Sequence, residues 1–493
     1  MIKSEFDTRG YKHFVLDNGM KVILVHDEDA TISGVSINVE VGSFNDGRIA
    51  GIAHFLEHLL FMGSHKYPEE NHYDKFITQH GGSTNAYTCD DHTCYYYSVD
   101  SDHLTESLDI FSRFFIDPLL AESAVEREMN AVDSEYQMDL TSDNFREEYL
   151  LKLVSNKNHP FSLFTVGNKE TLGIPDILDQ VRDFHKKFYS SDLMNLCVVS
   201  NMDLDQLEII TRNIFIQVQN KNLRSIVDNK IFPEIYDRKD ILIQMVPSDV
   251  TNSMKMIWQI KTDDEYIKYM PTHYISNLIG HECEGSILDI LVGKNYAYSL
   301  SVSSSEQHYP TFSSFSVNIG LTDEGMNNLN FVQKLVYEYI SLVLNDGITE
   351  YLYTDLVNTD HINWLYKEKC NPASYSVNIS NLMMTKFVPL KHLLAISEIR
   401  EKYNPATEYI IREYIKYLTP ENSIVVVSSP FYKESTSSYD PVFNTHYSVI
   451  FDQNKNIRYM QNTECNLKLP IENVFMPKRL NMLSTVTDLN PQK

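Results

Sequence analysis

The chain has 493 residues, of which 43% are hydrophobic and 22% are charged, and its formal net charge is −25 at pH 7. This is a globular composition in a chain too long for one ordinary core, so we expect two or three domains. The strong negative charge argues against nucleic acids and anionic membranes as partners. No apolar run approaches the roughly 20 residues that a membrane-spanning helix needs.

The cysteines and the first residues predict the compartment. Six cysteines are scattered along the chain without a C-x-x-C pair, and the first residues, MIKSEFD, contain no apolar signal core. Such a pattern is typical of reduced thiols, so we expect a cytoplasmic location. Cys89 and Cys94 leave one alternative open, because a hairpin would let them face each other and form a disulfide.

The first half of the chain predicts a mixed α and β unit. An Asn-Gly turn at 18–19 joins two short strands, and apolar residues alternate with polar ones from 35 to 41, as in a half-buried strand. The expected strands are 14–16, 20–25, 35–41, 84–89, 93–99 and 193–200. The expected helices are a segment through 54–58, then about 101–116, 122–140, 143–155, 175–188 and 203–216.

The second half repeats this order of elements, which predicts an internal duplication. We therefore expect an α+β fold of two tandem homologous α/β-sandwich domains, each a mixed, mostly antiparallel sheet packed by helices, with the second a degenerate repeat of the first. The domains would span 1–220 and 221–493, with a linker in 217–238 and an extended tail from about 445. The expected elements are strands at 240–247, 255–261, 296–304, 312–320 and 423–429, and helices at 271–280, 284–293, 322–345 and 349–368.

The most informative segment is H-x-x-E-H at 54–58. Four residues turn a helix by about 400°, so His54 and His58 leave the same face one turn apart. Two such imidazoles can bind one metal ion, and Glu57 lies close enough to contact a water on it. Two His ligands with a carboxylate base are the outline of a zinc hydrolase, here in the inverted order of the motif.

The alternative is a pair of satisfied core histidines. The flanking residues are apolar on every side of the helix, which predicts that the helix is buried. Burying His54, Glu57 and His58 without partners would cost several kcal/mol. A bound metal ion removes this cost, and we therefore favour it.

A catalytic zinc ion needs a third protein ligand and an open position. Glu128 and Glu135 are seven residues apart, almost two helical turns, so they share one face. One can bind the metal while the other holds a ligand histidine by its second nitrogen. Spacing alone does not say which carboxylate does which, and a solvated acidic face is the alternative.

With these motifs in place, the chain resembles the insulinase (insulysin/pitrilysin) family of inverted-motif zinc metallopeptidases, most of all the N-terminal half of its insulin-degrading branch. The resemblance extends over about 10–480 of this sequence. The matching residues are GIAHFLEH at 51–58, FMGS at 61–64, YP at 67–68, GSTNAYT at 82–88, EMNAVDSE at 128–135, HPFS at 159–162, GN at 167–168 and LIGHE at 278–282.

The resemblance implies a role for each matching position. It implies one Zn²⁺ per chain, bound by His54, His58 and Glu135, with Glu128 orienting a ligand and Glu57 as general base. The domain at 1–220 would be catalytic, and that at 221–493 an inactive homologue that contributes to substrate binding. The implied substrate-binding residues are Asn85 and Ala86 on an edge strand, Phe61 and Phe145 as apolar pocket walls, and His281 and Glu282 as an anchor for the peptide's N-terminus.

The implied function is a zinc-dependent endopeptidase that acts on short to medium peptides. Full-length relatives of this branch resemble two such chains in tandem, so a second homologous half, or a dimer partner, is an expected requirement for full activity. The alternative is a non-catalytic or regulatory peptide-binding subunit of a processing-peptidase-like assembly. Such subunits tend to lose a metal ligand or the base. This chain keeps all four of these residues, which are His54, Glu57, His58 and Glu135.

Overall fold

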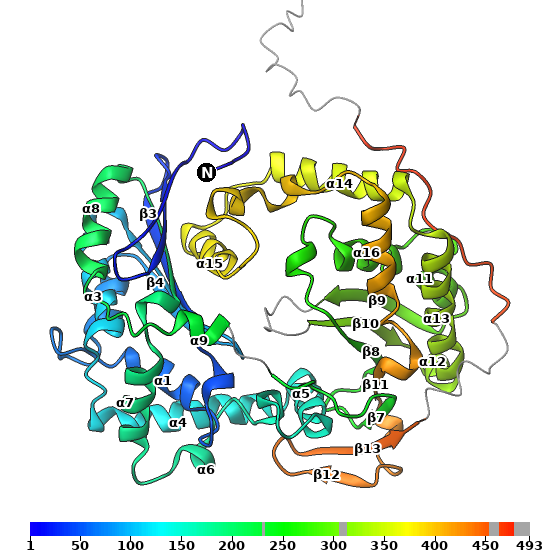
Figure 1. Ribbon diagram of the computed structural model, residues 1–493. Helices are drawn as coiled ribbons and strands as arrows, with labels where there is room; N and C mark the ends of the chain where they lie inside the picture. The colour runs from blue at the N-terminus through cyan, green and yellow to red at the C-terminus, as the bar shows by residue number, and fades with distance from the viewer. Residues whose placement is uncertain (229–231, 305–312, 453–462, 478–493) are drawn as a thin grey trace, which may run out of the picture.

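Six strands between residues 10 and 200 form the first sheet of the computed structural model, which describes residues 1–228, 232–304, 313–452 and 463–477 (Figure 1). The strand order is β1-β2-β6-β3-β5-β4, and every neighbouring pair is antiparallel except β2 with β6. This leaves β4 at an edge of the sheet. The strands are β1 (Gly10–Val15), β2 (Lys21–His26), β3 (Ile32–Val39), β4 (Ser83–Thr88), β5 (Thr93–Asp100) and β6 (Met194–Ser200).

Helices of the first half cover one face of this sheet. Side chains of β3 such as Val35 and Ile37 pack in one apolar core with residues of α1, α3, α7 and α8. The helices are α1 (Ile52–Leu60), α2 (His72–Gln79), α3 (Leu104–Ile116), α4 (Glu122–Asp139), α5 (Asp143–Val154), α6 (Lys169–Leu172), α7 (Ile177–Phe188), α8 (Leu204–Phe215) and α9 (Arg224–Asp228).

The second sheet contains seven strands in the order β12-β13-β7-β11-β8-β10-β9. Six of these strands repeat the first sheet, with a parallel central pair, β7 with β11, in place of β2 with β6, and β9 at the same edge as β4. The predicted fold of two repeated mixed sheets packed by helices is confirmed. The strands are β7 (Ile241–Met245), β8 (Asn252–Ile260), β9 (Ala297–Ser304), β10 (Ser313–Leu321), β11 (Ser423–Ser428), β12 (Ser438–Asp440) and β13 (Thr445–Phe451).

We expected an extended tail from about residue 445, and this prediction is wrong for the first residues of that segment. Residues 445–451 form β13, which pairs with β7 and takes the place that β1 has in the first sheet. The position that the N-terminal strand holds in the first sheet is thus held in the second sheet by β13, from the C-terminal end of that half, a long-range pairing that local sequence does not reveal. Described residues beyond β13, at 463–477, form no helix or strand.

The helices of the second half pack against one face of its sheet, with one exception. Helix α15 leaves this half and covers the second face of the first sheet, where it contacts β3 and β6 (Figure 1). Strand β3 is therefore buried on both faces, not on one as expected. The helices are α10 (Pro271–Ile279), α11 (Ile287–Gly293), α12 (Asp323–Asn327), α13 (Leu329–Asp346), α14 (Glu350–Leu365), α15 (Pro372–Leu382) and α16 (Pro405–Ile415).

Polar contacts hold α15 against the first sheet. The hydroxyl of Ser36 donates to Ser380 at 2.9 Å, and the amide of Asn38 donates to Asn381 at 2.7 Å. Gly34 allows the close approach, because a Cβ there would lie 2.2 Å from the backbone of Pro372. These alternate positions of β3 are polar because they face α15.

Among the described residues, no helix has the length and hydrophobicity that a membrane-spanning segment needs.

Candidate metal centre

The start of helix α1 is fixed by a glycine N-cap and by hydrogen bonds to a buried carboxylate. Its N-cap, Gly51, has φ +84°, a conformation that glycine adopts without strain. The buried carboxylate of Asp46 accepts the N–H groups of Gly51 at 2.8 Å and Ala53 at 3.0 Å. These are N–H groups that a helix start leaves without an intrahelical partner. Asp46 therefore fixes the start of the helix that carries His54, and no motif in the sequence predicted this role.

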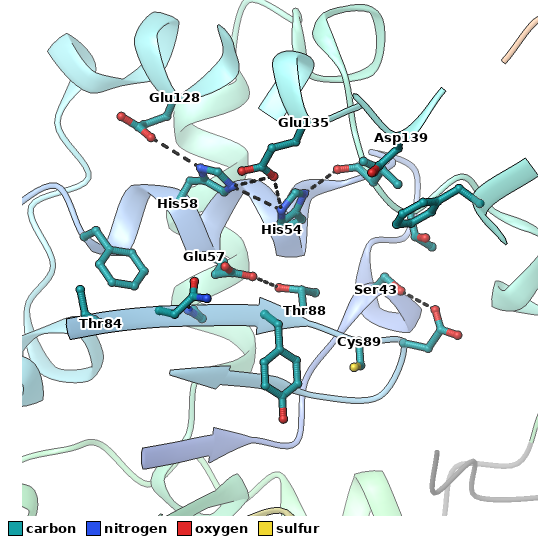
Figure 2. A pocket seen from close by; sticks show the side chains of 18 of the residues that line it. Ser43, His54, Glu57, His58, Thr84, Thr88, Cys89, Glu128, Glu135 and Asp139 are labelled. Carbon is teal, nitrogen blue, oxygen red and sulfur yellow. Dashed lines mark hydrogen bonds and ion pairs between the residues drawn. The ribbon is translucent and has the colours of Figure 1, made fainter. Parts of the chain in front are cut away.

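Three side-chain atoms converge between α1 and α4 (Figure 2). Glu135 Oε2 lies 3.3 Å from His54 Nε2 and 3.5 Å from His58 Nε2, and the two Nε2 atoms are 3.3 Å apart. Among the described residues, these three form the group whose side-chain atoms lie close enough together to bind one metal ion. Glu128, the other carboxylate on the same face of α4, points at the opposite nitrogen of His58.

The second nitrogen of each histidine has its own partner. His54 Nδ1 donates to the carbonyl oxygen of Val166 at 2.7 Å, and His58 Nδ1 lies 3.6 Å from Glu128 Oε2. A proton on each Nδ1 leaves the Nε2 lone pair free, and both Nε2 atoms face Glu135. The partners thus select the tautomer that a metal ligand requires.

The spacing of these atoms fits zinc. Ligand atoms about 2.0–2.1 Å from a tetrahedral zinc ion lie about 3.4 Å from one another. The three distances here, 3.3, 3.3 and 3.5 Å, match that value. Two imidazoles and one carboxylate are also a donor set of catalytic zinc sites, which keep a fourth position open.

The electrostatics of the group stabilise a positive charge at its centre. Burial lowers the pKa of His58, but Glu128 and Glu135 outweigh it and raise this pKa to about 9. Burial also opposes the charged form of His54, yet its pKa is raised, chiefly by Glu135. The two imidazoles in turn hold the pKa of the Glu135 carboxyl far below its usual range.

Glu57 is buried beside this group and is held by the neighbouring strand. Its Oε2 atom accepts a hydrogen bond of 2.6 Å from the hydroxyl of Thr88, at the end of β4 (Figure 2). Burial raises the pKa of Glu57 above that of an ordinary glutamate. A carboxylate with a raised pKa is a stronger base, so Glu57 is suited to accept a proton from water in the cavity.

A cavity of about 650 Å³ joins the metal-ligand group to strand β4. Asn85 and Ala86 line it on that strand, whose outer edge pairs with no other strand of the described sheet. An unpaired edge can accept an extended peptide by strand addition. Phe61, at the end of α1, and Phe145, on α5, also line the cavity.

Two expected substrate-binding residues lie elsewhere. His281 and Glu282 follow the end of α10 and are not among the residues that line the metal cavity. His281 Nδ1 accepts the backbone N–H of Cys283 at 3.1 Å. Their role in substrate binding stays a prediction. The cysteines Cys89 and Cys94 are both free, so the disulfide alternative is wrong.

Comparison with known proteins first defines the class. The model of Insulinase (Peptidase family M16) matches residues 21–157, that of the Peptidase M16 inactive domain matches 176–359, and that of the middle or third domain of peptidase M16 matches 364–493. The three matches together extend over most of the sequence. The chain belongs to the insulinase family, peptidase family M16.

Curated relatives and solved structures agree with this assignment. The chain is 35% identical to insulin-degrading enzyme-like 2 of Arabidopsis thaliana over 97% of this chain and 50% of that protein. It is 34% identical to the insulin-degrading enzyme of Bos taurus over 100% of this chain and 48% of that protein. The chain thus spans about half the length of the curated relatives it matches.

The crystal structure of pitrilysin superposes with a TM-score of 0.88, at 29% sequence identity, over 97% of this chain and 51% of pitrilysin. A protease from Helicobacter pylori shares the fold at a TM-score of 0.67 and 18% identity, over 85% of this chain and 99% of that protein.

Proposed function

We propose that this chain is the zinc-binding part of an endopeptidase that cleaves short to medium peptides. The observation that carries the proposal is the convergence of His54 Nε2, His58 Nε2 and Glu135 Oε2 within 3.3–3.5 Å of one another. Zinc in such a site supplies a water of lowered pKa and polarises the scissile carbonyl.

The chain's own residues perform the remaining tasks. Glu57 accepts a proton from the attacking water and returns it to the amine that leaves when the C–N bond breaks. Thr88 holds the Glu57 carboxylate in position, and the edge of β4 at Asn85 and Ala86 aligns the peptide backbone. Phe61 and Phe145 form apolar walls for peptide side chains.

Full activity, in this proposal, requires a second homologous half or a partner chain. The developing oxyanion of peptide hydrolysis needs donors, and removing one such donor from a protease costs about 10²–10³ in rate. No Lys or Arg is among the described residues that line the cavity. A homologous half facing the cavity would supply a cationic donor.

A cytoplasmic location is also part of the proposal. One relative, insulin-degrading enzyme-like 1 of A. thaliana, is named peroxisomal.

The test is cleavage of quenched fluorescent peptides by the zinc-loaded chain, alone and with a candidate partner half. We expect cleavage in the presence of the partner, and a loss of about 10²–10⁴ in rate for Glu57→Gln at unchanged zinc content. Cleavage by Glu57→Gln at the parent's rate would contradict the role of Glu57. Tight zinc and peptide binding without cleavage under any condition would favour the peptide-binding subunit instead.

A further inference from the structure

The hairpin of β12 and β13, from the second half of the chain, places one aromatic ring behind the wall of the metal cavity. Phe443, in the turn of this hairpin, is only 2% exposed. Its ring is parallel to that of Phe145, with an interplanar angle of 3° and 6.4 Å between centroids. Figure 1 shows β12 and β13 next to α5, the helix that carries Phe145.

Three further aromatic rings of the first half enclose Phe443. Its centroid lies 5.2 Å from that of Tyr149, 5.8 Å from Tyr136 and 6.0 Å from Phe164. Aromatic rings at these separations attract one another beyond the effect of the area that they bury. The ring therefore has a defined position, fixed by residues of α4 and α5 together.

Hydrogen bonds fix the backbone of the same turn. The buried carboxylate of Asp440 accepts the N–H groups of Val442 at 3.2 Å and Phe443 at 2.7 Å. The hydroxyl of Tyr136 donates to the carbonyl oxygen of Val442. Tyr136 follows the metal-ligand residue Glu135 in α4, so the turn is attached to the helix that forms one side of the site.

A small cavity remains beside these rings. Its volume is about 20 Å³, and Phe145, Phe443 and Val166 are among its lining residues. Phe145 and Val166 also line the large metal cavity, so they separate the two spaces. Phe145 is 37% exposed, and the ring of Phe443 packs against its ring.

We infer that Phe443 determines the size of the peptide side chain accepted beside Phe145. A smaller residue at 443 would enlarge the small cavity and let the Phe145 ring move back, which widens the pocket. A larger residue would push that ring forward. The second half of the chain would thus set the specificity of a pocket in the first half. This inference rests on the proposed function, because it assumes that a peptide occupies the metal cavity.

The test measures peptide affinity in the Glu57→Gln variant, which is expected to bind peptides without cleaving them. Affinity is measured for the chain alone and for the chain with the candidate partner half. Fluorescein-labelled peptides carry Ala or Phe at each position in turn, and binding is followed by fluorescence anisotropy. We expect Phe443→Ala to raise the Phe-to-Ala affinity ratio at one peptide position by about tenfold, the effect of a changed apolar pocket. Phe443→Trp should lower that ratio. Phe431→Ala, at an exposed phenylalanine of the same half, should leave it unchanged.

Each outcome bears on one of the two proposals. Where Phe443→Ala fails to fold, Phe443→Leu and Phe443→Trp provide the comparison, with zinc content as the check of an intact site. Equal weakening of every peptide, or ratios that match the Phe431 control, overturns the inference. If the parent still binds peptide, that result leaves the proposed function standing. Absence of binding to any peptide by the parent overturns both.

Discussion

Gly51 and Gly167 lie in direct backbone contact, and a Cβ added to Gly51 would stand 2.3 Å from the Cα atom of Gly167. This contact joins the start of α1, the helix that carries His54 and His58, to the loop before α6. The same loop presents the carbonyl of Val166 to His54 Nδ1 at 2.7 Å. The glycine pair therefore sets the orientation of His54, a proposed metal ligand, from outside the motif.

Gly51→Ala should weaken zinc binding. The residue has φ +84°, which costs an alanine about 1–2 kcal/mol, and the new methyl group would displace the loop that holds His54. Loss of such a ligand-orienting contact lowers metal affinity about 10–100-fold. Competition with a chromogenic chelator measures this affinity. Gly293→Ala is the control, because its methyl group would meet no atom within 4 Å, and an equal affinity of both variants would refute the prediction.

Thr88→Val should lower kcat and leave zinc content unchanged. The hydroxyl of Thr88 donates to Glu57 Oε2 at 2.6 Å, and valine removes this donor while it keeps the shape of the side chain. Because a general base contributes only when positioned, we expect a loss of roughly tenfold in kcat. Thr88→Ser restores the hydroxyl and should recover most of the rate. Steady-state kinetics that show only a change in KM would argue against positioning.

Glu128→Ala should weaken zinc binding without removing a ligand. Glu128 Oε2 lies 3.6 Å from His58 Nδ1 and favours the tautomer with a free Nε2. Its loss should cost about 10–100-fold in zinc affinity, less than the loss of a ligand. Glu126→Ala changes an exposed carboxylate on the same helix and serves as the control. Calorimetric titration with zinc that finds no difference between the two variants would contradict this role.

Asp109 should make stability depend on pH in the acid range. Burial opposes its ionisation, but Lys66, Tyr67 and Arg113 outweigh burial and lower its pKa to about 2. The pKa in the unfolded chain is about 3.9, so this contribution to stability is present above about pH 4 and is lost as the pH falls toward 2. Asp109→Asn should lower the urea midpoint at pH 7, with the difference from the parent shrinking toward pH 2. Asp183→Asn, at an exposed position of α7, is the control, and a difference that stays constant with pH would contradict the assignment.

The motif residues were predictable because helical spacing is local information. Four residues between His54 and His58 place both on one face of α1, and the apolar flanks predicted that this helix is buried. The choice between Glu128 and Glu135 was not predictable from spacing, since both lie on one face of α4. The distances favour Glu135 as ligand, because its Oε2 lies nearest both Nε2 atoms, whereas Glu128 lies at Nδ1 of His58.

The contacts that complete the site join residues distant in sequence, and for that reason they were missed. Val166 contacts His54 from 112 residues away. The turn at Phe443 reaches α4 from 306 residues away, through Tyr136 and Val442. The glycines at 51 and 167 were visible in the sequence, but only their close approach explains why both positions lack a side chain. Helix α15 was not predicted because its buried face includes Ser376 and Ser380 and so has little apolar periodicity.

The most direct test of the metal centre is the zinc content of the purified chain, together with zinc affinities for the parent and for His54→Ala and Glu135→Gln. We expect one zinc ion per parent chain, removable by a chelator, and an affinity at least tenfold lower in both variants, because each removes one of three protein ligands. A parent chain that binds no zinc, or a Glu135→Gln variant that binds it as tightly as the parent, would contradict the proposed site.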